Sequence, residues 1–246
     1  MTNGYIFRYT ITLVIIVAII LSATATLLYP LQKKNEDNEK MVNIMKAAGI
    51  TVTNNEDVYS LFDKYCTKML IINNDGTIID ECSDAVKTKC KAFNINLKNE
   101  LSKMADNKDY SLPVYVLQYD NKIINVIPLQ GTGLWGPIWG YMALSEDFDT
   151  VIGTVFDHKS ETPGLGAEIT TEKFSNQFKD KRLFKNGVFK SIAVVKGGIS
   201  ALDTEEQKYA VDAISGGTIT SNGVNDMIRN TLELYLPYIE KQNDKQ

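Results

Sequence analysis

Residues 9–29 form an apolar run without a charged side chain. About 20 such residues at roughly 1.5 Å each are enough to cross the ~30 Å hydrocarbon layer of a membrane. A cleaved signal peptide is the competing interpretation, because small residues lie near the end of the run. The length of the run and the helical pattern after it favour an uncleaved anchor. We therefore expect a short tail at 1–8 and a single-pass transmembrane helix at 9–29.

The charges that flank this run do not define its orientation. Arg8 precedes the run, and Lys33 and Lys34 follow it. The positive-inside rule gives no clear answer when so long a domain follows. The pattern alone leaves the side of the membrane open.

After the run, the hydrophobic positions take helical and then strand-like spacing. Met41, Ile44, Met45 and Ala48 recur every three or four residues and stop at Gly49, which suits a helix C-cap. This pattern predicts a helical stalk. Further helices are expected at 54–65, 171–178, 205–212 and 224–236. Strands are expected at 68–72, 77–80, 112–118, 123–129, 139–145, 150–156 and 187–195.

This succession of short strands, with helices near its ends, predicts an α+β fold. We expect a largely antiparallel sheet flanked by helices, together with the one N-terminal transmembrane helix. Neither βαβ alternation nor a GxGxxG motif is visible, so a dinucleotide-binding Rossmann unit is not expected. Residues 83–109 have little periodicity and are interpreted as a surface insertion or a weak helix. We divide the soluble part into a helical stalk and α/β lead-in region at 30–110 and a functional domain at 111–246.

The composition narrows the class of protein. The net charge of -4 predicts no basic face for nucleic acid. One histidine and three scattered cysteines do not supply a histidine/cysteine metal centre. A disulfide between Cys82 and Cys90 is an option in an oxidising compartment, but we favour three structural thiols, Cys66 included. We expect His158 to be structural, since no nucleophile or carboxylate is placed with it.

The stretch 212–223 carries the clearest chemistry. Asp212 is followed by Gly216 and Gly217, then by hydroxyl and amide side chains and a helical pattern. Glycines let a bulky group approach the backbone, and the N–H groups at a helix start stabilise a phosphate. The helix dipole contributes only about 0.3–1 kcal/mol, too little to hold a dissociable cofactor. A covalent bond to Thr218, on an exposed turn just before the helix, would retain one. The alternative is an ordinary Ser/Thr-Gly loop that caps a helix.

Two glycine-rich loops precede this stretch. At 161–168, Gly164 and Gly166 surround Leu165, so the loop can place a leucine and backbone amides against a flat ring. The alternative for this loop is a tight connection between a strand and a helix. At 130–141, four glycines and two tryptophans share one loop. A tryptophan there stacks on a cofactor or faces a partner, although core packing is its commoner role.

Asp212, Ser215, Gly216 and Thr218 match the flavinylation motif Asp-x-x-Ser/Thr-Gly-Ala-Thr/Ser, in which FMN is joined to the last hydroxyl as a phosphoester. Gly217 replaces the usual alanine. In that family a separate flavin transferase moves FMN from FAD onto the threonine. With the two upstream loops and the N-terminal apolar run, the chain resembles the C subunit of the Na+-translocating NADH:quinone reductase. The resemblance covers most of the chain and is weak across 30–110.

The resemblance implies an FMN-binding domain at 111–246 with one covalent FMN on Thr218. Around the attachment it places Ser215, Gly216, Gly217, Asp212, Thr220 and Ser221. Along the flavin ring it places Glu161, Thr162, Leu165 and Gly166, with Trp135 nearby. No residue is expected to act as a catalytic acid or base.

The resemblance also implies partners and a location. The flavin would relay single electrons among other subunits of a membrane complex that carries electrons from NADH to ubiquinone and exports sodium. A flavin transferase would act during maturation. The chain would be anchored in the bacterial inner membrane, with its soluble domain on the extracytoplasmic, periplasmic side.

Two alternatives stay open at this point. The G subunit of an Rnf-type ion-translocating electron-transport complex shares the threonine attachment and the Glu-Thr-Pro-Gly-Leu-Gly loop. The Gly-Leu-Trp-Gly-Pro segment at 133–137 and the greater length before it favour the quinone reductase. A flavin-free anchored assembly module, whose Ser/Thr-Gly loop is only structural, is the alternative from another class.

Overall fold

The computed structural model describes residues 3–53, 56–83 and 86–244. The chain forms two compact units, Met1–Lys40 and Met41–Gln246. Helix α1 (Asn3–Ala47) is the one helix of the described residues that is long and apolar enough to cross a membrane. It is already helical from Asn3 within the expected tail. It continues through the expected stalk, and Gly49 follows it with a φ of +78°, as a helix C-cap requires.

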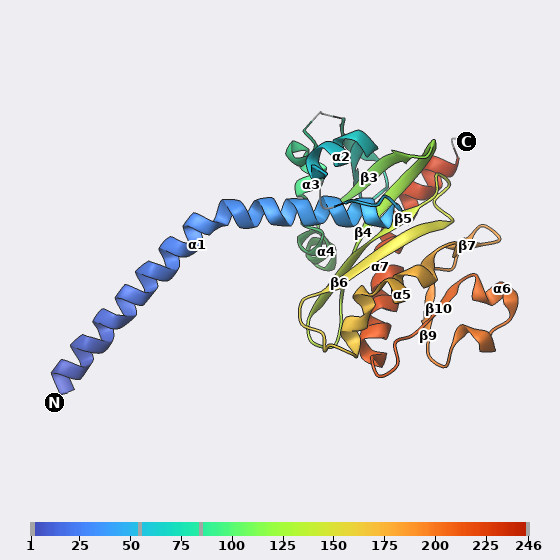
Figure 1. Cartoon of the computed structure of the whole chain (residues 1–246). Helices are drawn as coiled ribbons and strands as arrows, with labels where there is room; N and C mark the ends of the chain where they lie inside the picture. The colour runs from blue at the N-terminus through green and yellow to red at the C-terminus, as the bar shows by residue number, and fades with distance from the viewer. Residues whose placement is uncertain (1–2, 54–55, 84–85, 245–246) are drawn as a thin grey trace. The chain divides into compact units, whose positions relative to one another are not determined.

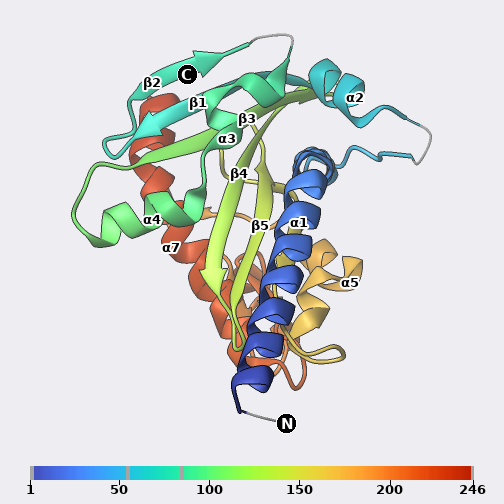
Figure 2. The same ribbon diagram turned by 90° about the vertical axis from the view of Figure 1, so that its left-hand side faces the viewer.

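The second unit is built on a six-stranded antiparallel sheet in the order β2-β1-β3-β4-β5-β6 (Figures 1 and 2). Its strands are β1 (Cys66–Asn73), β2 (Ile78–Cys82), β3 (Ser111–Tyr119), β4 (Lys122–Thr132), β5 (Pro137–Leu144) and β6 (Val151–His158). Six of the seven expected strands are present and make up this sheet. The sheet contains strands from both sides of residue 110, where the expected lead-in region ends, because β1 pairs directly with β3.

Helices flank this sheet, which confirms the predicted α+β class. They are α2 (Val58–Tyr65), α3 (Lys91–Asn94), α4 (Leu97–Ala105), α5 (Glu172–Ser175), α6 (Thr204–Gln207) and α7 (Thr218–Asn243). Short 3-10 helices occur at η1 (Lys87–Lys89), η2 (Gly166–Thr170), η3 (Asn176–Phe178) and η4 (Ile199–Ala201). The helix expected at 54–65 begins at Val58, and positions 54–55 lie outside the described residues. The region expected as an insertion or weak helix contains η1, α3 and α4.

Both faces of the sheet are buried, and alternate residues of each strand enter different cores. On one face, Leu112 and Val114 belong to the cluster that includes α7 (Figure 2). On the other, Tyr115 and Leu117 belong to the cluster that includes Met45 of α1. Burial of each large apolar side chain contributes about 1.5–3 kcal/mol. The two cores therefore hold α7 and the end of α1 on opposite faces of the sheet.

The chain after β6 differs from the expected pattern in two places. The single strand expected at 187–195 is wrong: the chain forms β8 (Val188–Phe189), paired with β7 (Phe184–Lys185), and then β9 (Ala193–Val195). Ser191 lies between them with a φ of +65°, which an extended strand excludes.

The helix expected at 205–212 ends at Gln207, and Ala210–Asp212 form strand β10 instead. β10 pairs in parallel with β9, and this pairing requires an extended backbone. A small β9–α6–β10 unit is therefore present, although no βαβ alternation was visible in the sequence.

The expectation of three structural thiols is wrong. Cys82 and Cys90 form a disulfide, with Cα atoms 5.9 Å apart, and Cys66 is free and buried. The end of β2 and the start of α3 lie side by side, so the bond ties the segment after β2 to the edge of the sheet. Burial raises the pKa of the Cys66 thiol to about 12, which keeps it protonated and unreactive at neutral pH.

The disulfide determines how many cysteine thiols can react with a labelling reagent. In denatured protein without reductant, iodoacetamide is expected to label Cys66 alone, and reduction is expected to expose Cys82 and Cys90 as well. Intact-mass measurement distinguishes the two states. Replacing Cys82 and Cys90 together by serine should lower the free energy of unfolding by about 2–3 kcal/mol, because the loop is no longer closed in the unfolded chain. Full labelling without reductant would contradict the bond.

Candidate functional site

Helix α7 begins at Thr218, six residues earlier than the expected start at 224, so Thr218 is its first residue rather than part of the preceding turn. The amide of Ser221 donates to the carbonyl of Gly217 at 2.8 Å, which starts the helical pattern there. Gly216 has a φ of +74°, a conformation that favours glycine. These contacts leave the Thr218 side chain exposed at the helix N-terminus.

Asp212 and Ser221 stabilise the turn before α7, at residues 213–217. An Asp212 carboxylate oxygen accepts from the amide of Ile199 at 2.6 Å, and the Asp212 amide donates to the side chain of Gln177 at 2.9 Å. The Ser221 hydroxyl accepts from the amide of Ile214 at 3.0 Å. Gln177 and Ile199 were not expected from the sequence, because no local motif marks a partner so far along the chain. Asp212 therefore bonds the backbone of a neighbouring loop.

The loop 161–168 contacts the start of α7 through Glu161. Its side chain is 5% exposed, and one carboxylate oxygen accepts from the Thr220 hydroxyl at 2.5 Å. The other oxygen accepts from the backbone amide of Trp135 at 2.8 Å. The Glu161 amide donates to Nδ1 of His158 at 3.2 Å, which gives that histidine a structural contact. One buried carboxylate thus joins all three of the loops singled out in the sequence.

Two glycines make room for this carboxylate. A Cβ atom on Gly166 would lie 2.3 Å from the Thr220 hydroxyl and 2.5 Å from Glu161. A Cβ atom on Gly133 would lie 2.6 Å from the other carboxylate oxygen. Gly216 approaches the same loop, because a Cβ atom there would lie 2.7 Å from Leu165. The glycines of the three loops allow close packing between them.

The start of α7 also packs closely against the end of β4. A Cβ atom on Gly223 would lie 2.4 Å from the carbonyl oxygen of Thr132, and one on Gly131 would lie 2.6 Å from Cβ of Met227. Side chains at these positions would push the helix away from the strand. Glycine therefore sets where Thr218 lies relative to the loop after β4.

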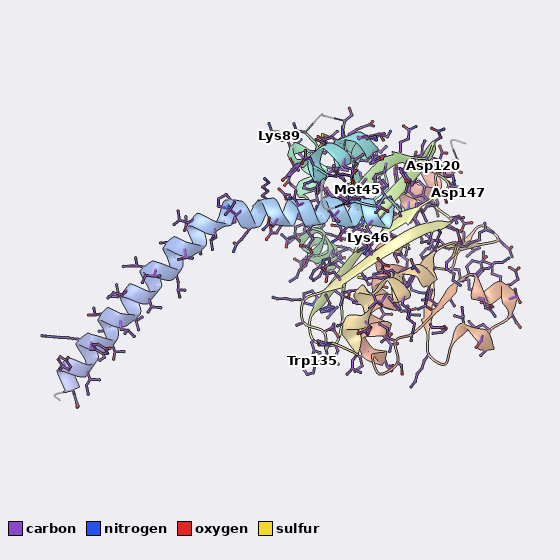
Figure 3. All side chains as sticks on the ribbon, in the orientation of Figure 1. Met45, Lys46, Lys89, Asp120, Trp135 and Asp147 are labelled. Atoms are coloured by element: carbon purple, nitrogen blue, oxygen red, sulfur yellow. A yellow bond between two sulfur atoms is a disulfide. The ribbon has the colours of Figure 1, made fainter. Side chains whose placement is uncertain are left out.

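Apolar side chains remain exposed on the same three loops. Their exposed fractions are 47% for Leu134, 64% for Trp135, 43% for Leu165 and 56% for Ile219. Figure 3 places Trp135 at the outer end of the β4–β5 loop. Leu134 and Ile219 were not expected as site residues. For Ile219 the available signal was an apolar residue among glycines and polar residues, and for Leu134 it was the position next to Trp135 in a glycine-rich loop.

Thr162 and Ser215 are exposed as well. The Thr162 carbonyl accepts from the amides of Leu165 and Ala167, both at 3.1 Å, and so closes the loop that presents Leu165. Of the residues named from the sequence, Glu161, Thr220 and Trp135 are thus joined by hydrogen bonds. Gly166 packs against Glu161 and Thr220. Leu165 and Gly216 touch beside it, whereas Asp212 bonds a different loop.

These features fit an FMN group. The first N–H groups of an α-helix have no acceptor within the helix, and no side chain caps α7. They can receive a phosphate next to the exposed Thr218 hydroxyl. The exposed apolar side chains offer a surface for a flat ring.

Comparison with known proteins agrees with this geometry. Residues 133–233 match the FMN-binding domain family. The C subunit of the Na(+)-translocating NADH-quinone reductase of Vibrio anguillarum is 31% identical to this chain, over 95% of this chain and 92% of the relative. The C subunit of the Chlamydia muridarum reductase is 30% identical, over 96% and 91%. The chain belongs to the C-subunit family of Na(+)-translocating NADH-quinone reductases.

Solved structures of the C subunit agree with the family and the fold. The structure from Parabacteroides distasonis has a TM-score of 0.72 and 35% identity, and covers 86% of this chain and 96% of its own. The structure of NqrC from Shewanella oneidensis has a TM-score of 0.68 and 27% identity, over 86% and 99%. The family resemblance noted in the sequence is confirmed, and with it a subunit of an oxidoreductase complex that has an FMN-binding domain.

The tight packing at Gly166 can be tested by adding one methyl group. Gly166→Ala should lower the free energy of unfolding by about 1–3 kcal/mol, because the Thr220 hydroxyl and Glu161 carboxylate must move. Each kcal/mol corresponds to roughly 2–4 °C of Tm for a unit of this size. Gly136→Ala is the control, because its Cβ atom would lie 2.9 Å from the Ser160 hydroxyl, which can rotate away, and 3.9 Å from Cβ of Lys159. Equal Tm values for the two variants would contradict the packing argument.

Proposed function

We propose that this chain is the membrane-anchored flavoprotein subunit of a Na+-translocating NADH:ubiquinone reductase complex, in which a covalent FMN on Thr218 relays electrons. The observation that carries the proposal is the exposed Thr218 hydroxyl at the start of α7. It lies within the region that matches the FMN-binding domain family.

Covalent attachment explains how the flavin is retained. Residues 212–223 contain no lysine or arginine, so the turn has no charged pair for a phosphate. Backbone amides and hydroxyls remain, and these suit a phosphodiester that is already bonded. In the attachment step, the Thr218 oxygen bonds to the FMN phosphorus of FAD while the phosphoanhydride bond breaks. AMP leaves and the hydroxyl proton is released, with a flavin transferase as catalyst.

The bound FMN supplies electron transfer, and the protein supplies its position. Thr218 tethers the phosphate, while Leu165 and Trp135 offer apolar surface to the ring. Glu161 and Thr220 hold these loops together behind the attachment point. Because the attachment side chain is exposed, redox centres of neighbouring subunits can approach the flavin closely.

Two features support the proposed side of the membrane. α1 is long and apolar enough for a single crossing, and the Cys82–Cys90 disulfide is of a kind that persists in oxidising compartments. Together they support anchoring in the bacterial inner membrane with the second unit on the periplasmic side. The partners on this proposal are the other subunits of the complex.

Replacement of the attachment residue tests the covalent bond. Thr218→Val should abolish flavin fluorescence on a denaturing gel when the chain is coexpressed with a flavin transferase, because no hydroxyl remains to bond the phosphorus. Thr218→Ser should retain it. Ser200→Ala is the matched control, since it removes an exposed hydroxyl that lies outside the motif. A fluorescent band in Thr218→Val, or none in the unaltered chain, would show that the attachment is wrong.

Thiol labelling tests the side of the membrane. Lys196→Cys introduces an exposed thiol into a chain whose own cysteines are buried or bonded. A membrane-impermeant maleimide should label this variant in intact spheroplasts, whereas the unaltered chain should stay unlabelled. Labelling that begins only after the membrane is permeabilised would place the domain in the cytoplasm.

A further inference from the structure

Glu161 combines burial, charge and contact with two loops in an unusual way. Its carboxylate is almost fully enclosed, and each oxygen has a donor from a different loop. Among the described residues, no lysine, arginine or histidine side chain forms a salt bridge with it. Two donors and no cation suit a carboxylate that is charged and hydrogen-bonded but not neutralised.

We propose that Glu161 is a positioning residue that ties the start of α7 to the Trp135 loop and places a negative charge behind the flavin attachment turn. The charge part of the proposal rests on the proposed FMN at Thr218. The bridging part depends only on the chain itself.

The bridge spans long distances in sequence. Trp135 lies 26 residues before Glu161 and Thr220 lies 59 residues after it. Local turns cannot bring these segments together, so the carboxylate is a direct link between them. Hydrogen bonds to a charged group are stronger than those between neutral groups, and the Glu161 carboxylate accepts two of them. Truncation at Glu161 should therefore loosen both loops at once.

The charge acts on the flavin through its position. Thr220 is two residues from Thr218 in the first turn of α7, and Gly166, which packs against the carboxylate, follows the Leu165 that touches Gly216. Reduction of a flavin adds negative charge, and a fixed carboxylate close by opposes it, more strongly where water is excluded. Glu161 should therefore lower the midpoint potential of the bound flavin.

Two variants separate the bridge from the charge. In Glu161→Gln, the side-chain oxygen can accept from the Trp135 amide while the amide group donates to the Thr220 hydroxyl, which also accepts. The bridge is kept and the charge is lost. Glu161→Ala removes both. Glu168→Ala is the matched control, because Glu168 lies in the same loop and its carboxylate accepts from the Gly164 amide of that loop, at 3.2 Å.

Hydrogen exchange on the full chain, produced without a transferase and therefore without covalent flavin, tests the bridge. Glu161→Ala should speed amide exchange about tenfold in peptides that cover Trp135 and the first turn of α7, because both hydrogen bonds are lost. Glu161→Gln and Glu168→Ala should leave both peptides as in the unaltered chain. Thr220→Val should speed exchange in the α7 peptide alone. Faster exchange in only one peptide of Glu161→Ala would overturn the bridge.

Redox titration of the flavin-loaded protein tests the charge. The midpoint potential of Glu161→Gln should be higher than that of the unaltered chain, while Glu168→Gln should leave it unchanged. A merely structural role predicts no shift in Glu161→Gln, because its hydrogen bonds are retained. Equal potentials would overturn the charge effect. Absence of covalent flavin from the unaltered chain would instead refute attachment at Thr218 and the charge part that rests on it, and the exchange result on the bridge would stand.

Discussion

The close approach of α7 to the end of β4 is the constraint on which the site depends. Gly223 lies against the carbonyl of Thr132, and no side chain larger than hydrogen fits there. Because α7 is one continuous helix anchored in the core by Ile228 and Leu232, this contact also sets the position of its first residue. Thr218 is therefore held by the packing of the whole domain.

Around the start of α7, hydrogen bonds join neighbouring loops, and apolar side chains form an exposed surface. Glu161, Thr220 and Asp212 bond other parts of the protein. Leu165 and Trp135 remain exposed. This division suits the proposed tethered FMN, because the hydrogen bonds would fix the point of attachment and the exposed side would leave the ring accessible to a redox partner. Family membership and geometry lead to the same kind of site.

The main elements of this organisation can be predicted from the sequence. The uncharged run at 9–29 favours an apolar environment, and the nearly continuous apolar run at 112–117 is typical of a strand that is buried on both faces. Asp212, Gly216 and Thr218 are recognisable because they match a family motif, and only Gly216, with a φ of +74°, is also favoured by the turn itself. The hydrophobic patterns follow from local physics, so the fold class could be predicted. The attachment of a flavin to Thr218 stays a prediction.

Contacts between distant segments could not be predicted in this way. The two partners of Glu161 lie 26 and 59 residues away, and only the folded sheet brings them within hydrogen-bonding distance. The break at Ser191, the strand at Ala210–Asp212 and the Cys82–Cys90 bond likewise depend on neighbours supplied by the tertiary structure. The sequence by itself determined which segments are apolar, extended or turned; the tertiary structure decided which of them meet, because pairing energy depends on contacts that no local pattern encodes.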